Sequence, residues 1–373
     1  MADEYDGTDR RSLFDWRRRQ FLKRVGTIGA GLALTDLILQ HSKSEAASPN
    51  SESLQAGETS AAAQASTGEI PRRSFGRTGV EVSAIGLGGY HMGVPKDERE
   101  AIRIIHEAMD AGIDFMDNAW EYNDGVSEQR LGKALQGRRD KAFVMTKVCT
   151  HGRDRKVAMQ QLEQSLRRLQ TDHIDLWQIH EVVYDNDPEL HFARGGVIEA
   201  LDQAKKEGKV RFVGFTGHKD PTIHLKMLSY NYPFDACQLP LNCFDASFRS
   251  FEKQVLPELQ KHGIAAIGMK SLGGSGEPVK QGAIAPQVAL SYAMSLPVAT
   301  TVSGIDSLQV LRQNLVIARG FTPMSAEQMQ ALRDRYARYA ADGRFELYKT
   351  SKQYDGKPGR EQHGFPSQQQ LPT

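Results

Sequence analysis

Four residues of types that hold or exchange protons stand at, or just after, the carboxyl ends of short apolar stretches. Asp117 and Tyr122 belong to "MDNAWEY". Lys147 lies in "FVMTKV", and His180 ends "DLWQIH". Each stretch has the length and composition of a buried strand. The four side chains form one site only if the fold brings these strand ends together.

Such a set of side chains can protonate an oxygen atom. A tyrosine hydroxyl has a pKa of about 10 and can donate its proton to a developing alkoxide. A neighbouring ammonium favours the phenolate, so Lys147 is expected to lower the pKa of Tyr122. Asp117 would keep Lys147 charged and oriented, and His180 could orient a carbonyl oxygen or share the proton. None of these side chains supplies hydride, so a reduction here requires a cofactor.

From residue 84 onward, short apolar stretches alternate with amphipathic helical patterns such as Ala101, Ile104, Ile105 and Ala108. Gly112 follows that helix where a left-handed cap is wanted, and Ser127 stands where an N-cap belongs before "EQRLGKAL". The predicted strands are Ala84–Gly88, Gly112–Asp117, Phe143–Thr146, Leu176–His180, Phe212–Thr216, Ala236–Leu239, Ala265–Met269 and Thr300–Val302.

Eight βα units of about thirty residues predict an α/β fold, a (β/α)8 TIM barrel. The segment "RRSFGRTGVEVS", with turn residues Arg77 to Gly79, predicts an N-terminal β-hairpin that closes the barrel floor. A helical pattern from Ser325 to Ala341 predicts a C-terminal helical extension. Because the carboxyl ends of barrel strands meet on one face, the four proton-handling residues are expected to converge there.

On these residues the chain resembles the aldo-keto reductases. The Asp, Tyr, Lys and His of that family are matched at Asp117, Tyr122, Lys147 and His180, with the spacing D-x-A-x-x-Y. The opening "RRSFGRTGVEVSAIGLGG" is also typical of the family, and the similarity runs from about Arg72 to Arg319. The resemblance implies an NAD(P)H-dependent oxidoreductase that reduces an aldehyde, ketone or sugar carbonyl, with Tyr122 as general acid. It also implies NADP(H) as the preferred cofactor and NAD(H) as a possible one.

The resemblance further assigns cofactor contacts. Thr216 and Gly217 stand where the family has a Ser-Asn pair that holds the nicotinamide amide, and Gly217 lacks the amide side chain. Gln238 matches a third nicotinamide contact, and Met269 replaces a tyrosine that commonly stacks on the ring. The clamp for a 2′-phosphate is less evident, with Arg312 as the nearest guanidinium. Other predicted cofactor residues are Lys270, Leu272, Gly273, Ser303, Gly304, Gln313 and Asn314.

Tyr90, Trp120 and Val182 are expected to wall the substrate pocket, because aromatic walls suit a small aldehyde, a ketone or the face of a sugar. The alternative for each of them is packing in the core. No metal site is predicted. The three cysteines, Cys149, Cys237 and Cys243, lack metal-ligand spacing, and they are expected to be buried free thiols.

Two other functions stay open from the sequence. One is a sugar-specific redox enzyme that retains its cofactor. The other is a cofactor-bound, non-catalytic sensing or accessory subunit. The complete set of Asp, Tyr, Lys and His favours catalysis, because a binding subunit need not keep both Tyr122 and Lys147.

Residues 1–40 place a basic segment before a weakly apolar one, which is the order of a secretory signal. "RRRQFLKR" resembles a twin-arginine signal at Arg18 and Arg19, although Arg17 precedes the pair and Asp36 interrupts the apolar run. Residues 41–70 have the composition of a disordered linker. Residues 63–65 (Ala-Gln-Ala) offer a cleavage site, and Ala46-Ala47 is a second possibility. This predicts export by the twin-arginine machinery to the periplasm or the outer face of the cytoplasmic membrane, with no stable membrane span after cleavage.

The remaining residues divide into a barrel over 71–320 and a C-terminal helix and tail over 321–373. A net charge of +1 and the lack of a basic stripe after residue 70 argue against nucleic-acid binding. The predicted partners are therefore a small carbonyl substrate and the export machinery.

Overall fold

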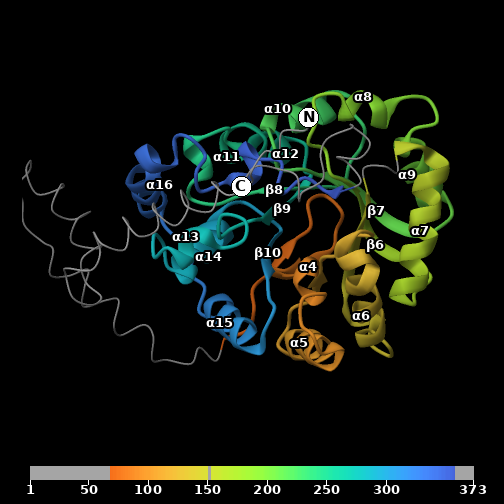
Figure 1. Ribbon diagram of the computed structural model, residues 1–373, viewed down its shortest axis with the longest axis horizontal. Coiled ribbons are helices and arrows are strands. Elements are labelled where there is room, and N and C mark those ends of the chain that lie inside the picture. Colours follow the sequence, from red (N-terminus) through yellow and green to blue (C-terminus); the bar gives the residue numbers. More distant parts are fainter. Residues whose placement is uncertain (1–67, 150–152, 358–373) are drawn as a thin grey trace, which may run out of the picture. The chain divides into compact units, whose positions relative to one another are not determined.

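Eight parallel strands close into a barrel in the computed structural model, which describes residues 68–149 and 153–357 (Figure 1). The strands neighbour one another in the order β10, β3, β4, β5, β6, β7, β8 and β9. This confirms the predicted (β/α)8 barrel. The strands are β3 (Ile85–Gly88), β4 (Phe115–Met116), β5 (Phe143–Cys149), β6 (Ile174–His180), β7 (Val210–Thr216), β8 (Ala236–Pro240), β9 (Ala265–Met269) and β10 (Thr300–Gly304).

Helices follow the strands and cover the outside of the barrel (Figure 1). Their apolar faces supply the periodic residues seen in the sequence, for example the buried Ala101, Ile104, Ile105 and Ala108 of α5. The helices are α4 (Gly89–Met92), α5 (Glu98–Asp110), α6 (Val126–Ala134), α7 (Arg155–Leu169), α8 (Asp187–Phe192), α9 (Val197–Lys206), α10 (Pro221–Ser229), α11 (Phe251–Gln254), α12 (Leu256–Lys261), α13 (Glu277–Lys280), α14 (Pro286–Ser295), α15 (Leu308–Arg319), α16 (Ala326–Ala340) and α17 (Leu347–Thr350).

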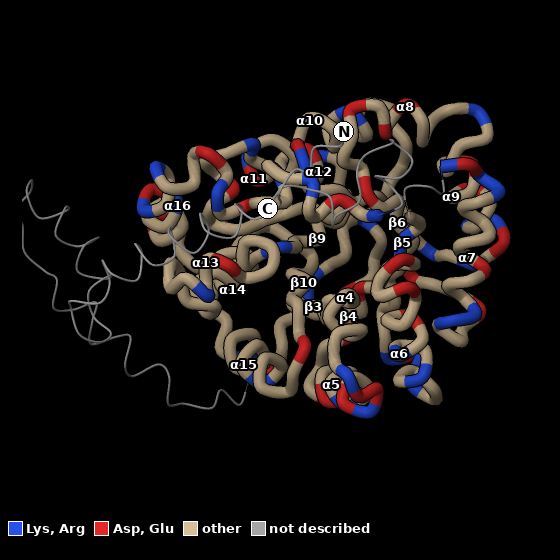
Figure 2. Tube along the Cα trace, viewed as in Figure 1, with Lys and Arg blue, Asp and Glu red and all other residues tan. Residues whose placement is uncertain are grey.

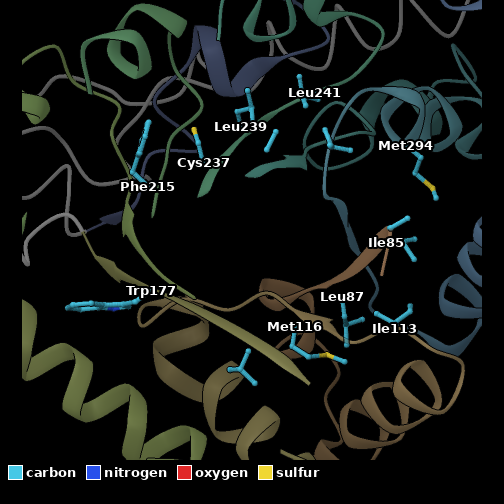
Figure 3. Close-up of a cluster of buried hydrophobic side chains, with 14 of the residues drawn as sticks. Ile85, Leu87, Ile113, Met116, Trp177, Phe215, Cys237, Leu239, Leu241 and Met294 are labelled. Atoms are coloured by element: carbon cyan, nitrogen blue, oxygen red, sulfur yellow. The ribbon is translucent and has the colours of Figure 1, made fainter. Parts of the chain in front are cut away.

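The layer between barrel and helices is apolar. Trp177, Phe215 and Leu239 belong to it, each fully buried on a different strand (Figure 3). Successive strand residues point to opposite sides of a sheet, so the neighbours of these residues face the barrel interior. Along β5 the inward set is Phe143, Met145 and then Lys147, so the alternation carries the lysine to the top of the interior.

A β-hairpin closes the floor of the barrel, as predicted. Strands β1 (Arg72–Ser74) and β2 (Glu81–Ser83) pair antiparallel. The turn between them is closed by the Phe75 N–H, which donates to the Val80 carbonyl at 2.7 Å. The Phe75 ring lies 4.9 Å from that of Phe143, between ring centroids, and so fills the bottom of the interior.

The structure confirms the predicted conformation of Gly112 and corrects the predicted N-cap at Ser127 and the predicted end of one strand. Gly112 takes the expected left-handed conformation, with φ of 101°. Ser127 is not an N-cap: α6 begins at Val126, and the Ser127 hydroxyl instead donates to the Gly89 carbonyl at 2.6 Å. Strand β5 runs past the predicted end to Cys149, because it pairs with β6 as far as His180. The three cysteines are free and buried, as their spacing predicts.

The C-terminal extension is also present. Helix α16 begins after Ser325, whose side chain accepts from the Gln328 N–H in a capping box. On the surface, Arg is interspersed with Asp and Glu along α5, whereas α7 carries four basic residues and one acidic residue (Figure 2). Within the described part of the chain, no helix has the length and apolarity needed to cross a bilayer. The predicted signal and linker, residues 1–40 and 41–70, lie almost wholly outside the described residues.

The barrel–helix layer generates a stability prediction. Phe215 is fully buried and packs on Phe234, with ring centroids 4.8 Å apart. Phe215→Ala should lower the free energy of unfolding by about 3–5 kcal/mol, because it removes buried apolar area and leaves a cavity. Leu190, which is 38% exposed, provides the control, and its change to alanine should cost less than about 1 kcal/mol. Urea titrations measure both, and equal losses would contradict the assignment of this layer as the core.

Candidate active site

An ion pair inside the barrel joins two of the predicted catalytic residues. The Lys147 ammonium contacts the Asp117 carboxylate, and it donates to the Asn118 carbonyl at 2.7 Å. Lys147 is 1% exposed and Asp117 4% exposed. A buried charge is stable only with a partner and hydrogen bonds, and this pair supplies both. Adjacent strands deliver the two residues, β5 carrying Lys147 and β4 ending just before Asp117.

Tyr122 reaches the same place from the loop after β4. Its hydroxyl lies 3.3 Å from the Lys147 Nζ, which donates to it. A backbone hydrogen bond attaches this loop to β5, since the Trp120 N–H donates to the Lys147 carbonyl at 3.1 Å. Asn123 and Asp124 follow in left-handed conformations with φ of 53° and 54°, which these two residue types tolerate better than most.

His180 closes the group from β6. Its ring lies edge-on to the Tyr122 ring, with centroids 5.8 Å apart and planes at 90°. The Nδ1 atom lies 2.7 Å from a carboxylate oxygen of Glu121. The structure therefore brings all four predicted catalytic residues together at the carboxyl end of the barrel.

The expected pKa of Tyr122 needs correction. Burial, reinforced by the carboxylates of Asp117, Glu121 and Glu181, raises the pKa of the Tyr122 hydroxyl well above its ordinary value. The prediction of a lowered pKa was wrong because burial and the surrounding carboxylates disfavour the phenolate, and the Lys147 charge is already matched by Asp117. Burial also lowers the pKa of Lys147 below its ordinary 10.5, while Asp117 acts in the opposite direction. At neutral pH the tyrosine therefore keeps its proton.

These residues lie in a cavity of about 1470 Å³ at the barrel mouth. Tyr122, Lys147 and His180 line it, and Asp117 lies behind Lys147. Among the described residues, no cluster of three His, Cys, Asp or Glu side chains is placed to hold a metal ion. The cavity is wide enough for a ligand far larger than a simple carbonyl compound.

Three of the predicted cofactor residues line this cavity: Thr216, Met269 and Lys270. Burial lowers the pKa of Lys270 to about 8. Its ammonium lies over the rings of Tyr348 and Tyr354, at 5.3 Å and 5.4 Å from their centroids. A cation held this way inside a cavity is suited to contact an anionic group of a ligand.

Three further predicted cofactor residues do not line the cavity. Gln238 is buried beside Thr216 and accepts a 3.1 Å hydrogen bond from Gln178. Leu272 packs against the core. Gly273 has a φ of 76°, in the left-handed region that favours glycine.

The predicted adenosine-binding segment forms β10 and α15. Asn314 donates to the Ser303 hydroxyl at 3.0 Å, and both residues are buried. Gly304 packs against the His91 ring, and Gln313 is exposed on α15. Arg312 forms two hydrogen bonds with Glu107, of 2.7 Å and 3.2 Å, and so is held toward α5.

The predicted substrate residues separate into two kinds. Tyr90 and Trp120 line the cavity, and Tyr90 stands edge-on to Tyr122 with ring centroids 5.8 Å apart. Val182 is fully buried and adds nothing to the cavity wall. It lies behind the wall because its N–H donates to the Thr216 carbonyl at 2.8 Å, which turns the chain into the core.

Comparison with known proteins agrees with this geometry. The model of the Aldo/keto reductase family matches residues 84–277. The chain belongs to this family. The oxidoreductase YqkF of Bacillus subtilis is 26% identical over 306 residues, which cover 70% of this chain and 95% of that protein. L-galactose dehydrogenase of Arabidopsis thaliana is 34% identical over 159 residues, 40% of this chain and 49% of the plant enzyme.

A solved structure of aldo-keto reductase AKR11C1 from Bacillus halodurans superposes with a TM-score of 0.61. It is 25% identical, with 72% of this chain and 96% of that chain covered. An aldo-keto reductase from Klebsiella pneumoniae, solved in complex with NADPH, has the same fold with a TM-score of 0.60 and 22% identity. That comparison covers 72% of this chain and 96% of the other.

Sequence reasoning missed two residues beside the four predicted catalytic residues. Glu181 directly follows His180, and His218 follows the Thr216-Gly217 pair. Both are buried and line the cavity, and Glu181 Oε2 lies 2.7 Å from His218 Nε2. An acid next to a strand-end histidine, with a second histidine two residues past another strand end, was the available signal.

The buried ion pair leads to a prediction about stability and pH. Asp117→Asn should lower the free energy of unfolding by about 3–5 kcal/mol, because the Lys147 ammonium stays buried without its counter-charge. The pKa of Lys147 in the folded protein should then fall further below its unfolded value of 10.5. Between those two pKa values the unfolded chain binds more protons, so the variant should regain stability as pH rises.

Denaturant titrations at pH 7 and pH 9 measure this slope in the variant and the wild type. Asp110→Asn is the control, since it breaks an exposed ion pair with Arg138 and should change stability by less than about 1 kcal/mol at either pH. A pH slope in Asp117→Asn no steeper than in the wild type would show that Lys147 is already neutral.

Proposed function

We propose that this aldo-keto reductase reduces an aldehyde, ketone or sugar carbonyl, with NAD(P)H as cofactor and Tyr122 as the general acid. The observation that carries the proposal is the Tyr122 hydroxyl, 3.3 Å from the ammonium of Lys147 at the cavity wall. Its raised pKa keeps the hydroxyl protonated at neutral pH, which is the state that a general acid needs.

The other three residues have complementary roles in this proposal. When Tyr122 gives its proton to a carbonyl oxygen, the Lys147 ammonium stabilises the phenolate left behind. Asp117 keeps that ammonium charged and oriented. His180, beside the Tyr122 ring, orients the carbonyl oxygen toward the hydroxyl.

Bound NAD(P)H would supply the hydride. The chain offers groups that fit such a ligand: Thr216 and Met269 on the cavity wall near the catalytic residues, and the half-buried ammonium of Lys270 for a phosphate. Gly273 and Gly274, with φ of 76° and 98°, allow close approach of the backbone. NADP(H) is the preferred cofactor in this proposal, in line with the NADPH bound to the Klebsiella pneumoniae structure, and NAD(H) is possible.

Replacement of the tyrosine tests the proposal. Tyr122→Phe should lower kcat by about 10²–10⁴-fold, because it removes the proton donor while the ring and its packing stay. Cofactor affinity should be unchanged. The assay follows cofactor oxidation at about 340 nm, the absorbance of the reduced nicotinamide, with NADPH and NADH in parallel against a panel of aldehydes, ketones and sugars.

Tyr230→Phe is the matched control, since Tyr230 is 40% exposed and stacks on Phe192 outside the cavity. Loss of cofactor binding in Tyr122→Phe would mean that the tyrosine is a binding residue. Tight cofactor binding by the wild type with no carbonyl consumed would favour the non-catalytic sensing or accessory function instead.

We also propose that the chain is exported by the twin-arginine machinery, on the evidence of the basic segment at Arg18 and Arg19. Arg18→Lys with Arg19→Lys keeps the charge and removes the paired guanidinium groups. In cells that carry this export system, the double variant should accumulate in the cytoplasm while the parent chain is found outside it. Fractionation followed by immunoblotting measures the distribution, and an unchanged distribution would count against this route.

A further inference from the structure

The described residues after α16, 341–357, form a tail that buried charges hold on the barrel. The Lys349 ammonium lies 2.6 Å from Asp245 and 2.9 Å from Glu346, and all three side chains are fully buried. Tyr348 is fully buried as well, and its hydroxyl donates to Glu346 at 2.5 Å and accepts from Asn242 at 2.9 Å. The tail is therefore part of the folded domain rather than an appendage.

A second anchor lies at the cavity itself. Lys219, in the loop after β7, forms an ion pair with Asp355 at 2.5 Å and donates to the Ser351 carbonyl at 2.5 Å. Tyr184, in the loop after β6, donates to the same aspartate at 3.2 Å. These contacts hold residues 353–357 on the cavity wall.

The tail reaches the catalytic group through Glu181. The Gly356 N–H donates to one Glu181 carboxylate oxygen, and His218 Nε2 lies 2.7 Å from the other. A carboxylate only accepts hydrogen bonds, so the Nε2 of His218 carries a proton. The Nδ1 of the same ring lies 3.1 Å from the Tyr348 carbonyl of the tail. The Gly356 N–H and the His218 ring, which both contact the Glu181 carboxylate, thus depend on the position of the tail.

Glu181 is close enough to influence His180 directly. Its Oε2 lies 3.9 Å from the His180 Nε2, which is beyond hydrogen-bond length but within strong Coulomb range in a buried site. Glu121 lies 2.7 Å from Nδ1 of the same ring, and its carboxylate can only accept a hydrogen bond from that nitrogen. A second negative charge beside Nε2 favours the ring that carries a proton on this nitrogen as well, and only that form can donate a hydrogen bond from Nε2 to a carbonyl oxygen.

We infer that Glu181 is a positioning residue for His180, and that docking of the C-terminal tail through Asp355 and Gly356 holds Glu181 in the position that makes the histidine a donor. The inference rests on the proposed reductase function for its effect on turnover. The link between Glu181 and the tail stands independently of that function.

Hydrogen exchange tests the link without any assay of activity. Glu181→Gln should speed exchange of the Gly356 amide about tenfold or more, because a neutral amide oxygen accepts more weakly than a carboxylate. Asp342→Asn is the control, since it breaks only the exposed 2.7 Å ion pair with Arg344 in the same segment. Unchanged exchange at Gly356 in Glu181→Gln would overturn the link.

Nitrogen NMR of 15N-labelled histidine reads the effect on the ring. Asp355→Asn should move the Nε2 resonance of His180, identified by its loss in His180→Asn, and Asp342→Asn should leave it in place. This measurement also succeeds if the chain turns over no carbonyl, so failure of the reductase proposal is distinguishable from failure of this one. An Nε2 resonance that stays in place in Asp355→Asn would overturn the positioning role.

Steady-state kinetics give the third measurement. Asp355→Asn and Lys219→Met should each lower kcat about tenfold with little change in KM for the carbonyl. The double variant should lose no more than either single one, because both changes break the same link. A loss confined to KM, or normal kcat in both variants, would reduce the tail to a passive wall of the cavity and overturn the proposal.

Discussion

The ammonium of Lys147 inside the barrel is the constraint on which the site depends. A charge at 1% exposure is stable only beside a counter-charge, and Asp117 must therefore stand next to it. The barrel satisfies this because neighbouring parallel strands end on the same face. The loop that carries Tyr122 is then tied to the Lys147 carbonyl through Trp120. The lysine thus organises the tyrosine both by charge and by its backbone.

The parts of the fold and site that could be predicted depend on local pattern. The strand stretches are short and apolar, and parallel pairing forces their carboxyl ends together, so the meeting of Asp117, Lys147 and His180 followed from their places in those stretches. Details that depend on neighbouring elements were less accessible. Ser127 reads as a cap in sequence, yet it is buried in the first turn of α6 because Gly89 offers a carbonyl to its hydroxyl.

Contacts between distant segments could not be predicted from local pattern. Nothing near Glu181 in the sequence indicates that Gly356, 175 residues away, donates to it. The same limit explains the error in the pKa of Tyr122. The sequence shows the cation of Lys147 and its partner, but the positions of Glu121 and Glu181 around the phenol depend on the whole barrel mouth.

These carboxylates also shape how the site can use its proton. A phenolate at Tyr122 would form among Asp117, Glu121 and Glu181, so the charge left by proton donation is unfavourable unless Lys147 neutralises it. The hydrogen bond from Lys147 to the hydroxyl places that neutralising charge in contact before any reaction begins. In the proposed reaction, Tyr122 would therefore readily take up a proton again after donating one. The site would then return to its protonated state after each turnover, provided that Asp117 keeps the ammonium charged.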